Sequence, residues 1–303
     1  EEYWTLDAEL KIAGEKKPLL AKFYGDSESK MNISSREEMD RVMAEISKET
    51  FKVIEVKKGE RVKKAPLPFT TSTLQQEASK ALNFPISKTM RIAQQLYEGV
   101  ELREEGSVGL ITYMRTDSLR ISEEALSAAG EVIRSRYGEK YYPGQPRRYK
   151  PKANAQDGHE AIRPSNVALY PELVEHDLTK DQYRLYKLIW NRFIASQMEN
   201  AVYDVTAIEA TCENQIFRAT HQSVAFAGFT AIYEEGKDDE QEAIGSPLPD
   251  LSEGEALMLL STDPQQHFTQ PPARYTEATL IKALEENGIG RPSTYAPIIT
   301  TIT

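Results

Sequence analysis

The chain has 303 residues, of which 40% are hydrophobic and 28% charged, and its formal net charge is −10. This length allows about two domains with a buried core, while the absence of a long apolar run or a signal-peptide pattern argues against a membrane span or secretion. A single cysteine, Cys212, excludes an internal disulfide and a cysteine-rich zinc site, which favours a cytoplasmic protein.

The charge is distributed unevenly along the chain. Residues 61–164 carry 17 Lys and Arg against 12 Asp and Glu, a net charge of +5, whereas the remaining residues carry 20 against 35. Because phosphate binding needs a local positive surface rather than a positive total, the middle third is compatible with a nucleic-acid partner. Uneven surface charge without any partner would explain the same counts.

The N-terminal part is predicted to be rich in strands. Short β-rich runs predict strands over residues 3–10, 19–24 and 51–56. Ser35, with Glu38 three residues later, predicts a capped helix over residues 35–48. Two prolines within residues 62–69 predict an irregular linker.

The middle of the chain is predicted to be mainly helical. Helical patterns cover residues 71–82, 87–104, 122–137 and 179–198. Ser122 is the expected N-cap of the third helix and Gly138 its stop, while Thr179 and Gln182 form a capping box for the fourth. A short β-rich run lies between the second and third helices, over residues 108–113.

The C-terminal part returns to strands over residues 201–262 and ends with a helix over residues 276–287, which Gly288 stops. The order of strands, helices and strands predicts an α+β fold in which a helical domain is inserted into a β-rich one. The chain has no initiator methionine and stops within an apolar periodic run, so we expect a piece of a longer protein.

Residues 109–118 read Gly-Leu-Ile-Thr-Tyr-Met-Arg-Thr-Asp-Ser and hold the main candidates for chemistry. In an extended chain Tyr113, Arg115 and Asp117 lie on one face, because side chains alternate. A phenol has an ordinary pKa near 10, and a nearby guanidinium favours the phenolate and neutralises a phosphate under attack. A strand tyrosine that only pairs with neighbouring charges would explain the same three residues.

This segment closely resembles the active-site motif of type IA DNA topoisomerases, whose tyrosine forms a 5′-phosphotyrosyl bond with a cleaved strand. The resemblance implies that Tyr113 is the nucleophile, that Arg115 stabilises the phosphate charge, and that Asp117 tunes protonation and placement. Met114 is similar to the bacterial topoisomerase I branch, since the topoisomerase III branch more often has proline there.

A second segment, residues 158–165, resembles the same family and reads Gly-His-Glu-Ala-Ile-Arg-Pro-Ser. Histidine titrates near neutrality, so the resemblance implies that His159 assists proton movement or binds phosphate. Arg163 could bind phosphate or anchor the loop, and the sequence leaves both roles open. Taken alone, a histidine such as His159 is more often structural.

A third segment, residues 273–295, resembles the border of the family's groove for single-stranded DNA. There Arg291, Ser293 and Thr294 offer a charge and hydroxyls to a DNA backbone. Residues 68–75 are also family-like, but their hydroxyls are predicted to be helix caps.

The resemblance covers essentially the whole chain and implies parts of a torus that opens to pass a strand. The expected domains are a β-rich arch over residues 1–72 and 200–270, an inserted helical domain with the catalytic tyrosine over residues 73–199, and the start of a helical DNA-binding base over residues 271–303.

The family also places a Toprim domain, with a catalytic glutamate and a magnesium-binding acidic cluster, before this region. No Asp-x-Asp-x-Asp occurs in this chain. We therefore expect no metal in the chain itself and Mg²⁺ bound by a Toprim domain elsewhere in the same polypeptide. The other expected partner is single-stranded or negatively supercoiled DNA, bound by a monomer in the bacterial cytoplasm at the nucleoid.

The implied function is ATP-independent relaxation of negative supercoils through transient cleavage of one strand, strand passage and religation. The chain alone is expected to bind DNA without relaxing it. Three alternatives stay open: a fragment of topoisomerase III or reverse gyrase, a non-catalytic DNA-binding gate module, and a structural or protein-interaction role without DNA contact.

Overall fold

A computed structural model describes residues 1–303 except 28, 47–49, 104, 151–157, 236–246 and 303. The chain divides into two compact units, each built from segments that are separate in the sequence. The first unit comprises Glu1–Val62, Val202–Phe226 and Glu242–Ala273, and the second comprises Lys63–Ala201, Ala227–Gln241 and Arg274–Thr303. A mainly helical region is thus inserted into a strand-rich unit, as the order of elements in the sequence predicted.

Six strands of the first unit close into a barrel in the order β1-β2-β7-β6-β3-β8. They are β1 (Glu2–Ile12), β2 (Leu19–Asp26), β3 (Phe51–Lys63), β6 (Ala201–Cys212), β7 (Gln215–Phe226) and β8 (Ala256–Phe268). The first and last strands of the chain, β1 and β8, pair antiparallel along their whole length. The barrel closes where Phe51 and Lys52 of β3 pair antiparallel with Leu257 and Ala256 of β8.

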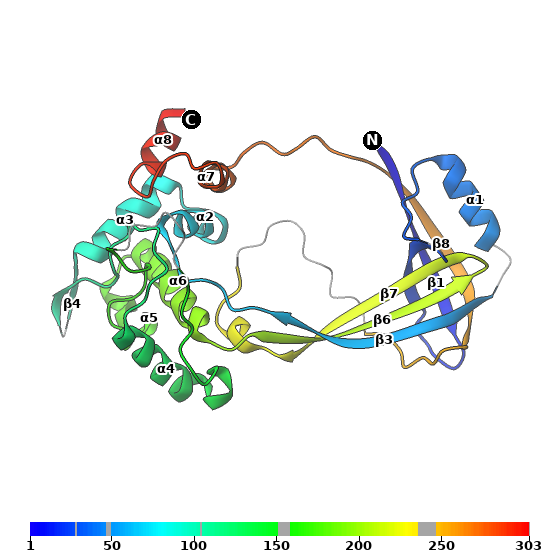
Figure 1. The fold of residues 1–303 in the computed structure, drawn as a ribbon, viewed down its shortest axis with the longest axis horizontal. Helices are drawn as coiled ribbons and strands as arrows, with labels where there is room; N and C mark the ends of the chain where they lie inside the picture. Colours follow the sequence, from blue (N-terminus) through cyan, green and yellow to red (C-terminus); the bar gives the residue numbers. More distant parts are fainter. Residues whose placement is uncertain (28, 47–49, 104, 151–157, 236–246, 303) are drawn as a thin grey trace. The chain divides into compact units, whose positions relative to one another are not determined.

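The barrel core is filled by alternate side chains of these strands. On β1 the inward residues are Leu6, Ala8 and Leu10, each at most 1% exposed. Helix α1 (Arg36–Ile46) lies beside the strands of this unit (Figure 1). Its buried side chains Met39, Val42 and Ile46 belong to the same apolar cluster. Ser35 caps this helix as predicted, through the N–H of Glu38 at 3.2 Å, but the Glu38 carboxylate bonds Ser34 instead of completing the predicted capping box.

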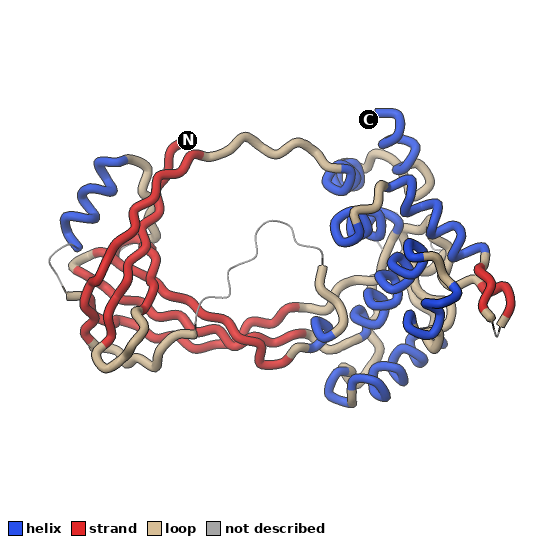
Figure 2. Tube along the Cα trace, turned by 180° about the vertical axis from the view of Figure 1, so that it is seen from behind, coloured by secondary structure: helices blue, strands red, loops and turns tan. Residues whose placement is uncertain are grey.

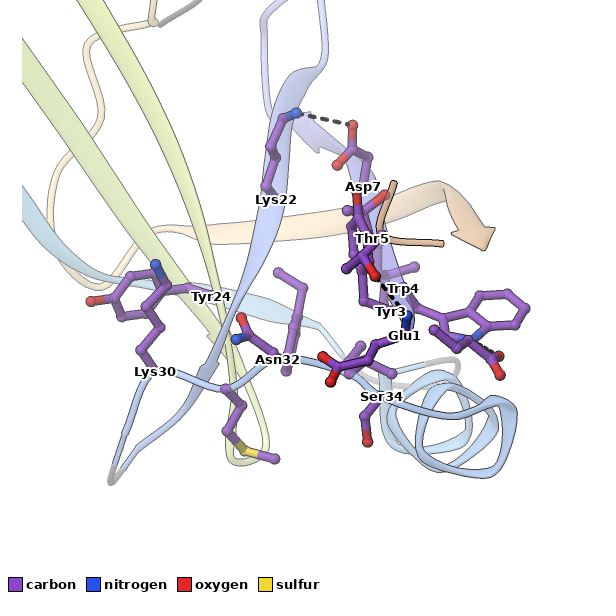
Figure 3. Close-up of a pocket in the computed structure, with 16 residues that line it drawn as sticks. Glu1, Tyr3, Trp4, Thr5, Asp7, Lys22, Tyr24, Lys30, Asn32 and Ser34 are labelled. Carbon is purple, nitrogen blue, oxygen red and sulfur yellow. Dashed lines mark hydrogen bonds and ion pairs between the residues drawn. The ribbon is translucent and has the colours of Figure 1, made fainter. Parts of the chain in front are cut away.

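A pocket of about 550 Å³ opens on the first unit, lined by residues from β1, β2 and the segment that follows β2 (Figure 3). Lys22 and Asp7 form an ion pair of 3.9 Å at its wall. The residues that line the pocket include neither a histidine nor a cysteine.

The second unit is mainly helical (Figure 2). Its α-helices are α2 (Thr71–Leu82), α3 (Ile86–Glu98), α4 (Glu123–Tyr137), α5 (Pro171–Val174), α6 (Lys180–Gln197), α7 (Glu277–Glu286) and α8 (Tyr295–Ile302). Short 3-10 turns lie at η1 (Glu139–Tyr141), η2 (Glu175–Asp177) and η3 (Gly228–Ala231). Within the described part of the chain, no helix has the length and apolar character needed to cross a bilayer.

Helix ends in this unit follow local signals in the sequence. Ser122 caps α4 through the N–H of Ala125, and Thr179 with Gln182 forms the predicted capping box of α6. The helix predicted over residues 87–104 is too long, because α3 ends at Glu98. Gly99 follows with a φ of 129° that favours glycine, and the chain enters a hairpin of β4 (Val100–Leu102) and β5 (Gly106–Val108).

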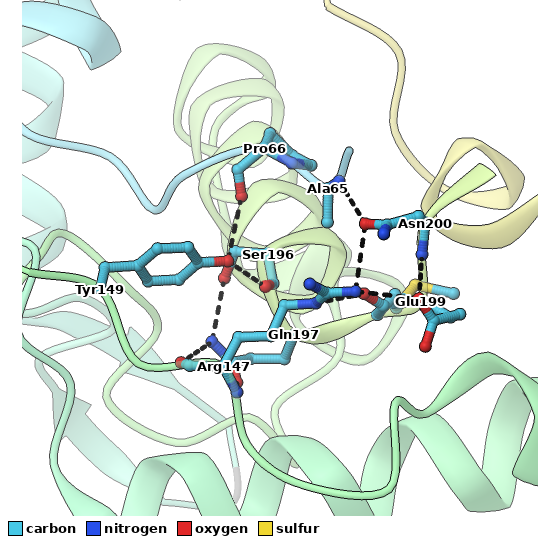
Figure 4. Close-up of polar contacts among 9 residues, drawn as sticks. Ala65, Pro66, Arg147, Tyr149, Ser196, Gln197, Glu199 and Asn200 are labelled. Atoms are coloured by element: carbon cyan, nitrogen blue, oxygen red, sulfur yellow. Dashed lines mark hydrogen bonds and ion pairs between the residues drawn. The ribbon is translucent and has the colours of Figure 1, made fainter. Parts of the chain in front are cut away.

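The two ends of the inserted helical region are tied together by polar contacts (Figure 4). The Asn200 side-chain oxygen accepts hydrogen bonds from the N–H of Ala65 at 3.0 Å and from the Arg147 guanidinium at 3.1 Å. The Tyr149 hydroxyl donates to the carbonyl of Ser196 at 2.5 Å. The entering chain near Ala65 and the leaving chain near Asn200 are therefore fixed to the same loop.

Burial raises the pKa of Tyr149 to about 12, while the charges of Arg147 and Arg192 lower it by less. The pKa of this phenol is higher in the folded state than in the unfolded chain, where it is near 10. Its contribution to the stability of the fold is therefore fully present below pH 10 and is lost as the pH rises from 10 to 12. We expect Tyr149→Phe to make the loss of stability between pH 10 and pH 12 shallower. Urea denaturation at several pH values measures this, and parallel pH profiles for variant and wild type would contradict it.

Candidate active site

The segment that carries Tyr113 belongs to neither a helix nor a sheet. It makes one isolated bridge, between Ile111 and Pro164, and the backbone bends on both sides of Tyr113. The strand predicted over residues 108–113 is therefore wrong beyond Val108, where β5 ends. The exposure of side chains nevertheless alternates, with buried positions at Met114, Thr116 and Ser118. Tyr113, Arg115 and Asp117 are the more accessible positions between and beside them.

Thr71, the first residue of α2, fixes one side of this segment. Its N–H donates to the carbonyl of Thr116 at 2.9 Å, and its hydroxyl donates to the carbonyl of Met114 at 2.7 Å. The same hydroxyl oxygen accepts from the N–H of Thr116 at 2.8 Å. Residues 68–75 were predicted to supply helix caps: Thr70 does so, but Thr71 instead holds the backbone that follows Tyr113.

Thr112 fixes the other side of the segment to the chain that follows His159. Its N–H donates to the carbonyl of Arg163 at 2.9 Å, and its hydroxyl donates to the carbonyl of Ala161 at 2.7 Å. The N–H of Arg163 returns a hydrogen bond to the Thr112 hydroxyl at 3.0 Å. These bonds bring together two motifs that are well separated in the sequence.

The Tyr113 ring consequently lies against the His159 imidazole, with ring centroids 4.9 Å apart and planes tilted by 38°. His159 is exposed. An imidazole can take up or release a proton near neutral pH, so this arrangement places a proton carrier beside the phenol. Tyr97, on the last turn of α3, also contacts the Tyr113 ring, at 5.4 Å and 69°.

Arg115 follows Tyr113 by two residues, and its side chain is exposed. Among the residues that the structure describes, its guanidinium makes no hydrogen bond or ion pair. Its donors are therefore available to the oxygens of a phosphate, which the planar guanidinium can bind in pairs.

Arg163 differs from Arg115, because its side chain is only 11% exposed and its donors are occupied. It binds the Glu160 carboxylate at 2.7 Å and 2.6 Å, and it donates to the carbonyl of Pro164 at 2.9 Å. A weaker contact of 3.4 Å reaches the hydroxyl of Ser122 at the start of α4. This environment favours the anchoring role over phosphate binding.

Arg291, Ser293 and Thr294 lie on the exposed turn between α7 and α8. The Thr294 hydroxyl is used within the turn, where it accepts from the N–H of Arg291 at 2.8 Å. The Arg291 guanidinium donates to the carbonyl of Gly290 at 2.9 Å. Among the three side chains, Thr294 is thus the one that the turn itself requires.

The same turn lies beside the end of the Tyr113 segment. Tyr295, the next residue, is buried, and its pKa is raised first by burial, then by the charges of Glu285 and Asp117, while Arg291 lowers it. Glu285 also accepts a short hydrogen bond from the hydroxyl of Ser72 on α2. The charges of Asp117 and Arg291 therefore act on one phenol, although the sequence separates them widely.

Neither Tyr97 nor the contact between Ser72 and Glu285 stands out in the amino-acid sequence. Tyr97 fell within a predicted amphipathic helix, where an aromatic residue usually packs in the core. Ser72 looked like one of several hydroxyls near a helix start. No local pattern distinguishes either residue from its neighbours, because their roles arise from contacts with distant segments.

A mainly helical unit is inserted into a strand-rich unit, and it presents a tyrosine beside a histidine and an arginine. The fold matches that of type IA topoisomerases. The family model described as DNA topoisomerase matches residues 1–303, and the chain belongs to this family. Full-length topoisomerase I from Thermotoga maritima is a similar solved structure, with 36% sequence identity and a TM-score of 0.79. The match covers 100% of this chain and 46% of that chain, so this chain spans less than half of that relative.

We expect Thr71→Val to destabilise the second unit by about 1–3 kcal/mol, because it leaves buried backbone groups of residues 114–116 without partners. Thr300→Val is the control, since its exposed hydroxyl bonds only the preceding turn of α8 and its loss should cost at most about 0.5 kcal/mol. Urea denaturation monitored by circular dichroism measures both. Equal stability of the two variants would show that Thr71 does not hold the segment.

Proposed function

We propose that this chain is the strand-cleaving part of a type IA DNA topoisomerase that relaxes negative supercoils, with Tyr113 as the nucleophile. The observation that carries the proposal is the contact between the Tyr113 ring and the His159 imidazole at 4.9 Å, on a segment that also presents the exposed guanidinium of Arg115. Membership of the DNA topoisomerase family supports it.

In the proposed reaction the phenolic oxygen of Tyr113 bonds to a backbone phosphorus, and the bond from phosphorus to the 3′ oxygen breaks. The phenol loses its proton, and the leaving oxygen gains one to become a 3′ hydroxyl. One ester replaces another, so the reverse attack by the 3′ hydroxyl reseals the strand without ATP. Negative supercoiling supplies both the single-stranded substrate and the driving force.

The other site residues act around this exchange. Arg115 binds the phosphate oxygens as negative charge builds up on them. His159 and Asp117 tune protonation and placement around the phenol. Arg163, which is held by Glu160, positions the loop that carries His159.

Arg291, Ser293 and Thr294 are proposed to contact the backbone of single-stranded DNA. The Thr294 hydroxyl also accepts a hydrogen bond within the turn. Such contacts position a strand without reading its sequence. The exposure of all three side chains on the turn beside Tyr295 supports this placement.

Magnesium enters the proposal only through another part of the protein. Within the described residues no group of three or more His, Cys, Asp or Glu side chains could hold a metal ion. We assign the Mg²⁺ expected from the family to a Toprim domain outside this chain, and no step above passes through it.

We also propose a division of the chain into three domains. Residues 1–72 and 200–270 are assigned to an arch, residues 73–199 to the inserted domain that carries Tyr113, and residues 271–303 to the start of a DNA-binding base. The polypeptide is proposed to act as a monomer on single-stranded or negatively supercoiled DNA in the bacterial cytoplasm.

Topoisomerase I is favoured over topoisomerase III and reverse gyrase, because the structure of a bacterial topoisomerase I resembles the whole chain and because Met114 follows the tyrosine. The second candidate function, for this chain in isolation, is a DNA-binding gate module that does not relax DNA. The chain covers only 46% of the similar full-length topoisomerase I, which favours that behaviour. Full relaxation of a plasmid by the chain alone would contradict it.

We expect Tyr113→Phe in the complete protein to abolish the covalent protein–DNA adduct, because no phenolic oxygen remains to attack phosphorus. Tyr141→Phe, on the 3-10 turn η1, is the control and should form the adduct at the wild-type level. Denaturing gel electrophoresis with an end-labelled oligonucleotide measures the adduct. Wild-type amounts of adduct from Tyr113→Phe would refute the proposal.

A further inference from the structure

Tyr97 is a second aromatic residue at the Tyr113 site, and the steps proposed above do not use it. Its side chain is 41% exposed, although its ring contacts that of Tyr113. Within the described residues its hydroxyl has no hydrogen-bond partner. By contrast, Tyr186 in the core of the same unit is fully buried, and its hydroxyl donates to the carbonyl of Leu169 at 2.6 Å. Tyr97 differs from this core tyrosine in both respects.

The backbone next to Tyr97 is attached to the backbone that leads to Tyr113. The N–H of Leu110 donates to the carbonyl of Leu96 at 2.7 Å, and Leu96 itself is fully buried. A Cβ atom on Gly109 would lie 2.7 Å from the carbonyl oxygen of Tyr97, so only glycine allows this approach. These backbone contacts therefore fix the position of Tyr97 relative to the segment that leads to Tyr113.

The geometry of the two rings leaves one face of Tyr97 uncovered by Tyr113. The planes meet at 69°, which is an edge-to-face arrangement. If the edge of Tyr113 points at Tyr97, it covers one face of Tyr97; if the edge of Tyr97 points at Tyr113, it covers neither. In both cases at least one face of Tyr97 is not covered by Tyr113, and the Tyr97 side chain is 41% exposed.

We propose that Tyr97 is a stacking platform for the base of a nucleotide next to the phosphate that Tyr113 attacks. The inference rests on the proposed function, because it takes single-stranded DNA as the ligand. A stacked base adds affinity without sequence selection, since every base has an aromatic face. With Arg115 on the phosphate and Tyr97 under the base, one nucleotide is held at two points beside the phenol.

The competing explanation is that Tyr97 only packs against Tyr113. The two explanations differ in what they expect of DNA affinity. Packing alone changes the placement of the phenol and hence the rate of cleavage, whereas stacking changes the binding of a strand even when cleavage is prevented. The test is therefore made in a Tyr113→Phe background, in which no strand can be cut.

In that background, we expect Tyr97→Leu in the complete protein to weaken binding of a short single-stranded oligonucleotide about tenfold. Tyr97→Phe should bind like the parent, because stacking needs the ring and not the hydroxyl. Tyr3→Leu is the matched control: Tyr3 is also 41% exposed and also lies against another ring, that of His267 at 5.0 Å. Its affinity should not change.

A second measurement needs no substitution of Tyr97. Oligonucleotides that carry 5-iodouracil at successive positions around the cleavage site are irradiated with the complete protein, and cross-linked peptides are identified by mass spectrometry. A cross-link to Tyr97 at a position next to the cleaved bond supports the platform. Either unchanged affinity of Tyr97→Leu or the lack of a cross-link to Tyr97 at every position overturns it.

These outcomes are separable from failure of the proposed function. Loss of the adduct in Tyr113→Phe establishes the nucleophile whatever Tyr97 does. If that adduct is lost but Tyr97→Leu binds DNA like its parent, the platform is wrong while the topoisomerase assignment stands.

Discussion

The structure of the active segment depends on a few hydrogen bonds made by two threonines. The chain around Tyr113 joins no sheet, so its backbone groups need partners from elsewhere. Thr71 supplies them from the start of α2, and Thr112 supplies them from within the segment to the chain that follows His159. Because these bonds fix both sides, the phenol is presented toward solvent from a defined backbone rather than from a flexible loop.

The same principle extends to the neighbouring helices. Ser72, next to Thr71, bonds Glu285 of α7, and the carboxylate of Glu277 accepts from the N–H of Ile86 at the start of α3 at 2.8 Å. Apolar contacts of Ile281 with Ile86 complete this packing. The turn between α7 and α8 is thereby held beside the Tyr113 segment by contacts that are partly polar and partly apolar.

Local signals in the sequence predicted most helix ends, because a cap such as Ser122 or Thr179 acts on backbone groups two or three residues away. The motif around Tyr113 could be recognised only through its resemblance to a family. Closure of the barrel could not be predicted, since it requires β1 and β8 to pair across nearly the whole chain. The contact of Tyr97 with Tyr113 was missed for a local reason: a helix was expected to continue to residue 104, whereas α3 ends at Glu98.

The central claim is that the phenolic oxygen of Tyr113 becomes bonded to DNA. The most direct measurement traps the complete protein on a single-stranded oligonucleotide with denaturant, digests both components, and determines by mass spectrometry which side chain carries the remaining nucleotide. The account predicts a 5′-phosphoryl nucleotide on Tyr113. The same mass on Tyr97, on a serine or on any other residue would contradict it.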